Sequence, residues 1–218
     1  MRYLLLVAVV LFSAGPALAH DEHSARPDSS MTSAFEATLE TARAAIRRHG
    51  VTDSAMVEIQ AALAKLAAMP SLRDNAHLQQ IHGSSGSNAA LLAGSGHDSL
   101  SLYLARFQPG HATPVHDHQT WGVLYVLEGR DHYIHWDVDY TTGDRSRADV
   151  RMATGAILGP GSSVYWFPPP HDLHSQQAIG GTVWELLISG RNFLSPEVLE
   201  QRHYFDRSTG TVTPMPRK

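Results

Sequence analysis

The chain has 218 residues, of which 43% are hydrophobic, so it can bury the core of one folded domain. Its formal net charge is −4, which argues against nucleic acid or an anionic membrane surface as the main partner, because both need a basic face. Cysteine is absent, which excludes disulfides and cysteine-ligated metal sites. The fourteen histidines, set against seventeen lysines and arginines, direct attention to metal ligands and acid–base chemistry.

Residues 1–19 have the pattern of a secretory signal peptide. Arg2 precedes an unbroken apolar run over residues 3–12, and Ala17-Leu18-Ala19 is a small-x-small cleavage pattern. The run is shorter than the roughly 20 residues that a membrane-spanning helix needs, so a transmembrane anchor is the weaker interpretation. We therefore expect an exported, periplasmic protein whose mature chain starts at His20 and has no membrane contact after cleavage.

A helical segment is expected before the main domain. Residues 20–31 are polar and predict a disordered lead-in. Within residues 32–83, apolar residues recur at helical spacing and are bounded by cap and breaker residues. This pattern predicts three helices that pack on the following domain, between Ser33 and Gly50, between Asp53 and Pro70, and between Ser71 and Gly83.

Strand patterns separated by turn signals dominate residues 84–218. Residues 83–96 are rich in Gly, Ser and Ala and are interpreted as a loop or weak strand. Seven strands are expected after it, at residues 100–107, 122–128, 132–138, 148–152, 163–167, 174–178 and 182–189. Short strands at this spacing, with no long helix between them, predict a mainly β domain of the antiparallel barrel or sandwich type.

Three histidines form a candidate metal site. His116 and His118 are two residues apart, and on a strand such residues project to the same face. The third candidate is His174, at the end of a proline-rich turn in which His171 is the alternative ligand. Three neutral imidazoles suit iron, zinc, copper or nickel, and they leave coordination positions open for water, substrate or oxygen.

The residues around these histidines resemble the two motifs of the cupin superfamily. Gly110 precedes the His116-Asp117-His118 triplet at the spacing of the first motif, and Gly129 lies near that motif's end. The second motif is matched by Pro169 and His174. The resemblance covers roughly residues 100–189 and implies a cupin double-stranded β-helix barrel, preceded here by the short helical segment.

A narrower resemblance is to the thiol dioxygenases. The acid of the first cupin motif is missing, since its place falls on Gly122 or Val123. Thiol dioxygenases lack it too, and their Pro-Val-His-Asp-His followed by Thr-Trp-Gly is similar to residues 114–122 here. Residues 203–210 also resemble their C-terminal His-x-Phe-Asp-x-x-Thr-Gly segment.

This resemblance implies a non-haem Fe(II) dioxygenase that oxidises a small thiol with O2. His116, His118 and His174 would hold the iron, and zinc, manganese, nickel or copper are the other metals considered. The alternatives are a non-catalytic periplasmic cupin that binds a metal or a small ligand, and a cupin enzyme of different chemistry.

Two substrate-binding features of cysteine dioxygenases have no counterpart. Their carboxylate-binding arginine would fall near Ala90, and residues 84–96 contain neither Arg nor Lys. Their Ser-x-His-x-Tyr set would fall within residues 182–189, which read Thr-Val-Trp-Glu-Leu-Leu-Ile-Ser. Because a bidentate arginine is the usual way to orient a carboxylate, we expect weak or absent activity on free cysteine.

The remaining candidates surround the metal site. Arg106 is the candidate for binding an anionic substrate if its strand face lines the barrel; a barrel-end arginine is its alternative, and Arg151 is less favoured. Glu185 is either an inward acid or an outward surface residue. Substrate binding is assigned to Arg106, Trp121 and Tyr133, and catalysis to Tyr125 and Glu185, although aromatic residues are more often core.

Overall fold

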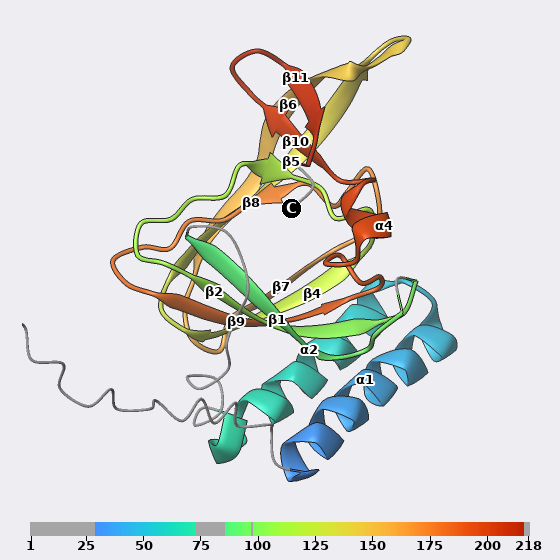
Figure 1. Cartoon of the computed structure of the whole chain (residues 1–218), viewed down its shortest axis with the longest axis vertical. Helices are drawn as coiled ribbons and strands as arrows, with labels where there is room; N and C mark the ends of the chain where they lie inside the picture. Colours follow the sequence, from blue (N-terminus) through green and yellow to red (C-terminus); the bar gives the residue numbers. More distant parts are fainter. Residues whose placement is uncertain (1–28, 73–85, 97, 216–218) are drawn as a thin grey trace, which may run out of the picture.

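Two helices cover one side of a strand-rich barrel in the computed structural model (Figure 1). The structure describes residues 29–72, 86–96 and 98–215. The predicted signal peptide, most of the lead-in and most of the third helix lie outside these ranges. Within them, no helix is both long and apolar enough to span a bilayer. The predicted mainly β class with N-terminal helices is confirmed.

The helices are α1 (Ser29–His49) and α2 (Asp53–Ala67). α1 begins four residues before the predicted cap; Ser33 lies inside the helix, where its hydroxyl donates to the carbonyl of Ser29, 2.9 Å away. Residues 29–31, predicted to belong to the disordered lead-in, are therefore helical, and Met31 is buried. α2 begins at Asp53 as predicted.

Five strands form the sheet on which the helices pack. They are β1 (Ser87–Ala93), β2 (Ser101–Phe107), β9 (Val183–Ser189), β4 (Gly122–Glu128) and β7 (Ser163–Trp166), hydrogen-bonded in that order. Every neighbouring pair is antiparallel. β1 lies in the segment interpreted as a loop or weak strand.

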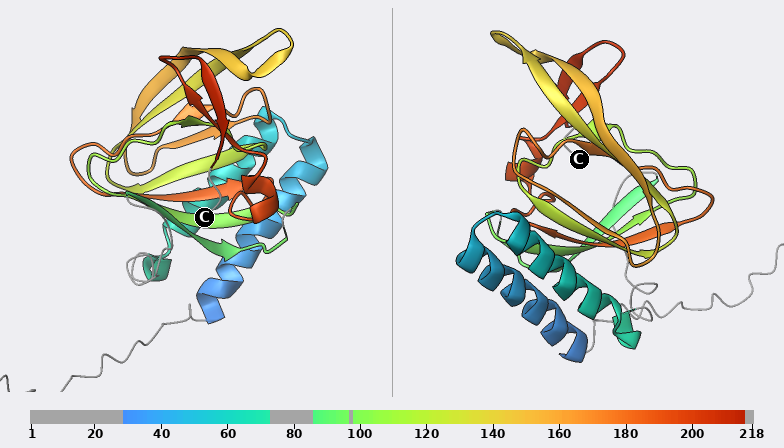
Figure 2. Two further views of the ribbon diagram at one scale, coloured as in Figure 1. Left: turned by 45° about the horizontal axis from the view of Figure 1, so that its top comes forward. Right: turned by 180° about the vertical axis from the view of Figure 1, so that it is seen from behind.

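The remaining strands form a second sheet, which closes into a ring. They are β10 (His203–Asp206), β11 (Thr211–Pro214), β6 (Asp144–Leu158), β5 (Asp131–Thr141), β8 (His174–Ser175) and β3 (Val115–His116), in that order. Figure 2 shows the β5–β6 and β10–β11 hairpins projecting away from the helices. β6 is much longer than predicted, because most of its residues are exposed and give no apolar alternation.

Alternation along β2, β4 and β9 decides which side chains reach the site. One face packs on the helices and carries Leu102, Leu104, Val123, Trp184, Leu186 and Ile188. The other faces the barrel interior and carries Tyr103, Ala105, Leu124, Val126, Val183 and Leu187. A residue in phase with the first set is therefore directed away from the interior.

Candidate metal centre

Three histidines meet at the junction of β3 and β8. The two strands are antiparallel neighbours, and His116 is paired directly with His174. His118 follows two residues after His116, just beyond the end of β3. The ligating nitrogens of the three side chains all lie within 4.8 Å of one another, and each side chain is buried. The alternative residue of the proline-rich turn, His171, is exposed.

Hydrogen bonding leaves lone pairs free for a metal ion. The Nδ1 atom of His116 lies 2.9 Å from the carbonyl oxygen of Pro114, which can only accept, so Nδ1 carries the proton and Nε2 keeps its lone pair. Both ring nitrogens of His118 and Nδ1 of His174 are buried without a partner in the described part of the chain. An unsatisfied buried nitrogen costs about 1–3 kcal/mol, and a bound metal ion would remove that cost for one nitrogen of each ring it binds. The residues therefore fit a metal ion.

Burial keeps these imidazoles in the protonation state that binds metals. It lowers the pKa of His116 to about 3, with a further decrease from the nearby positive charge of Arg202. Burial and Arg202 also hold the pKa of His118 and of His174 well below the usual range. All three rings are thus neutral at physiological pH, as metal ligation requires.

The two aspartates beside the ligands support the backbone. A carboxylate oxygen of Asp172 accepts from the backbone N–H groups of His118 and Gln119, at 2.9 and 2.7 Å. The Asp117 carboxylate accepts from the backbone N–H of His203 at 2.8 Å and contacts its ring Nδ1 at 3.0 Å. These bonds fix the loop that carries His118 and join it to β10.

A cavity of about 670 Å³ adjoins the three histidines. Much of its wall is apolar, and the indole of Trp166 lies over two ligands, with ring centroids 4.6 Å from His174 and 5.2 Å from His118. A side chain at Gly122 would overlap that indole, so the glycine makes room for it. The polar wall residues are Ser87, Asn88, His111, Thr113, Gln176, Glu185, Arg202 and Tyr204.

Arg202 is the residue that the sequence analysis missed. It is 5% exposed and lines the cavity. Its Nε donates to the carbonyl of Asp117 at 2.8 Å, and its guanidinium lies 5.3 Å from the ring centre of Phe193. In the described ranges no carboxylate lies within 4.0 Å of it, so its charge has no ion-pair partner. Arg202 directly precedes residues 203–210, which resemble the C-terminal segment of the thiol dioxygenases. That resemblance could have identified it.

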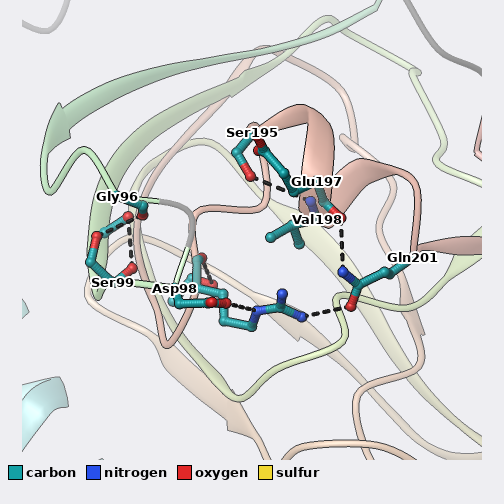
Figure 3. A network of polar contacts seen from close by, with 10 residues as sticks. Gly96, Asp98, Ser99, Ser195, Glu197, Val198 and Gln201 are labelled. Atoms are coloured by element: carbon teal, nitrogen blue, oxygen red, sulfur yellow. Dashed lines mark hydrogen bonds and ion pairs between the residues drawn. The ribbon is translucent and has the colours of Figure 1, made fainter.

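The segment leading to Arg202 is joined to the connection between β1 and β2. The side chain of Arg191 donates to Asp98 at 2.9 Å and to the Gln201 side chain at 3.0 Å (Figure 3). Between them, the hydroxyl of Ser195 accepts from the backbone N–H of Val198 and caps the short helix α4 (Pro196–Leu199). These contacts hold the segment from which the Arg202 guanidinium reaches the cavity.

The structure separates the other candidates into two groups. Glu185 lies in the cavity wall, and Tyr133 is buried in the interior with its ring 5.1 Å from that of His174. Trp121 and Tyr125, predicted to bind substrate and to act in catalysis, instead pack in the cluster that faces the helices, and neither lines the cavity. The physical reason is alternation, since both are in phase with the helix-facing residues of β4.

The two predicted anion-binding arginines also lie elsewhere. Arg106 is in phase with Leu102 and Leu104 on the helix-facing side of β2, and its guanidinium lies 5.6 Å from the ring centre of Trp184. The condition for substrate binding by Arg106, that this face lines the barrel, is therefore not met. Arg151 is exposed on β6 and contacts Asp149 at 3.6 Å.

No protein-family model and no curated protein matches the chain. Similar solved structures include KdgF from Halomonas sp., at 16% identity and a TM-score of 0.39, over 53% of this chain and 90% of that one. A cupin superfamily protein from Desulfitobacterium hafniense is 17% identical with a TM-score of 0.37, over 52% and 84%. An oxalate decarboxylase variant from Bacillus subtilis is 19% identical with a TM-score of 0.39, over 55% and 29%. The solved neighbours thus include cupins, and the partial likeness leaves the function to be inferred from the chain's own residues.

Proposed function

We propose that the protein is a non-haem Fe(II) dioxygenase of thiol-dioxygenase type, which oxidises a small thiol with O2. The observation that carries the proposal is the set of three neutral imidazoles, with nitrogen lone pairs unsatisfied, beside a cavity of about 670 Å³. A ferrous ion held there by His116, His118 and His174 would supply open coordination positions and the redox chemistry that oxygen requires. The first-motif similarity over residues 114–122 favours thiols as substrates.

The protein's own contribution is to bind and orient the substrate. A divalent ion on three neutral ligands keeps its full charge, and Arg202 adds a further positive charge in the same cavity. Such a cavity favours an anionic substrate, and a planar guanidinium is suited to a carboxylate. We therefore assign to Arg202 the role that the sequence analysis gave to Arg106. Weak activity on free cysteine was expected because residues 84–96 contain no arginine that could bind the substrate carboxylate. Arg202 could bind it instead, so that argument no longer applies.

Oxygen consumption by iron-loaded protein tests this function. We expect thiol-dependent O2 uptake with at least one of cysteine, mercaptopropionate and cysteamine, and formation of the corresponding sulfinate. Zinc-loaded protein should show none, because zinc has no redox chemistry. Absence of thiol-dependent uptake across the panel, with iron bound at one equivalent, would contradict the proposal.

The second candidate is a non-catalytic cupin that binds a metal or a small ligand. The observation that favours it is the absence of the Ser-x-His-x-Tyr set from residues 182–189, where β9 presents Glu185 to the cavity. Saturable binding of a thiol to the metal-loaded protein, without oxygen uptake, would support this candidate instead.

Export to the periplasm is also proposed, on the signal-peptide pattern of residues 1–19. Expression of the whole chain in a Gram-negative bacterium should give a periplasmic protein whose intact mass corresponds to a chain starting at His20. A variant with Ala17 and Ala19 both replaced by bulky residues should keep the leader, since small residues are needed at the cleavage site. Recovery of uncleaved wild-type protein from the cytoplasm would refute export.

A further inference from the structure

A buried pair of acids lies at the wall of the cavity. Asp131 and Glu185 are each 1% exposed, and Glu185 lines the cavity. The side-chain nitrogen of Gln176 donates to both, at 3.0 Å to Asp131 and 2.9 Å to Glu185. Because one amide nitrogen serves both groups, the two carboxyls are close neighbours.

The two acids differ in their support. Asp131 also accepts from the backbone N–H of Gln177 at 3.1 Å, so both of its oxygens have a donor. Glu185 accepts from the Gln176 amide and shares a side-chain hydrogen bond with Asp131, while its Oε1 has no donor within the described chain. No basic side chain forms an ion pair with either acid in the ranges described. Two adjacent buried carboxylates would repel strongly, so the pair is expected to hold one proton.

The surroundings place that proton on Glu185. Burial and the neighbouring Asp131 charge raise the pKa of Glu185 well above its usual range. Burial also raises the pKa of Asp131 to about 6, against the effect of its hydrogen bonds and of His132. Burial and, after it, the charges of Asp131 and Glu185 raise the pKa of the Tyr133 hydroxyl, which stays protonated. Near pH 7 the pair therefore has a carboxylic acid at Glu185 and a carboxylate at Asp131.

We propose that Glu185 and Asp131, bridged by Gln176, are the proton acceptor for the substrate thiol in this cavity. The inference rests on the proposed function. The S–H bond breaks, its proton bonds to the Glu185 carboxyl, and the proton that Glu185 already held passes to Asp131. Sulfur keeps the electron pair as a thiolate, the charge of the pair changes from −1 to 0, and loss of one proton to water restores it.

The first test detects the proton directly and does not depend on turnover. Infrared spectra of metal-loaded protein at pH 7.5 should show a protonated carboxylic acid band that is absent from Glu185→Gln. Glu128→Gln is the matched control, because Glu128 is an exposed glutamate of β4, and it should keep the band. An unchanged band in Glu185→Gln would overturn the assignment of the proton to Glu185.

The second test is the pH profile of thiol-dependent oxygen uptake. Wild-type activity should fall as pH drops below about 6, because a doubly protonated pair cannot accept a proton. Glu185→Gln with full iron content should lose about 100-fold in kcat, the lower range for general base catalysis. Its remaining rate should rise towards about pH 8.5, where a free thiol ionises unaided.

Two further measurements separate the possible failures. Asp131→Asn should also lower kcat, since it removes the group that takes the second proton, while the exposed Asp137→Asn of the same strand should not. Unchanged kcat in both Glu185→Gln and Asp131→Asn would overturn the base role. No thiol-dependent uptake by the wild type would instead refute the proposed function and the thiol as proton source, and the infrared band would still decide where the proton resides.

Discussion

Replacement of His174 by alanine is expected to abolish stable iron binding and, with it, thiol-dependent oxygen uptake. The variant keeps only two of three imidazoles, and the ring of His174 is central to the site, with centroids 4.7 and 4.8 Å from those of His116 and His118. Changes to groups that merely orient a ligand typically cost 10–100-fold in metal affinity, so loss of a ligand should cost more than about 100-fold. Elemental analysis and titration with Fe(II) under anaerobic conditions would measure it.

The matched control for this variant is His171→Ala. His171 belongs to the same proline-rich turn but is exposed, so its loss should leave one equivalent of iron bound. Circular dichroism of the iron-free variants checks that the barrel is still folded, because the His174 ring also packs against Trp166 and Tyr133. Retention of iron by His174→Ala, or its loss in His171→Ala, would show that the ligand assignment in this turn is wrong.

Replacement of Arg202 by methionine is expected to weaken the use of thiols that carry a carboxylate. The buried guanidinium has no carboxylate within 4.0 Å among the described residues, and Asp117 and Asp172 act on it only from farther away, so a substrate carboxylate could pair with it directly. Hydrogen bonds to charged groups contribute about 1.5–3 kcal/mol, which predicts a decrease of about 10- to 150-fold in kcat/KM for mercaptopropionate. Cysteamine, which has no carboxylate, should change by less than about threefold.

The choice of substrates distinguishes recognition from simple structural damage. Arg202 also donates to the carbonyl of Asp117, beside two metal ligands, so general disruption would lower activity on both thiols alike. Arg202→Lys should retain part of the preference, since it keeps the charge but loses the planar fork. Arg106→Met is the control at the position that the sequence analysis favoured, and it should leave both substrates unaffected. An equal loss for mercaptopropionate and cysteamine would disprove carboxylate binding by Arg202.

Short-range patterns account for the parts of the structure that could be predicted from sequence. Strands β4, β7 and β9 were predicted to within one residue at each end, because each is a mostly apolar run bounded by Gly, Pro or Ser. The failures lie where the apolar signal is weak. β3, β10 and β11 were not predicted: β3 is two residues long, and β10 and β11 are held by their neighbours in the second sheet. β6 was predicted too short because most of it is exposed.

The sequence by itself determined the metal-ligand candidates and the mainly β class. The i, i+2 spacing of His116 and His118 requires no knowledge of distant contacts, and it follows from the geometry of an extended chain. Only the tertiary structure decided which side chains share the cavity with them. Strand alternation offers two faces, and the face that meets the helices is known only once α1 and α2 are packed on the sheet, which turned Arg106, Trp121 and Tyr125 away. Arg202 and Glu185 reach the site because separate segments converge on one wall, and no local pattern encodes that convergence.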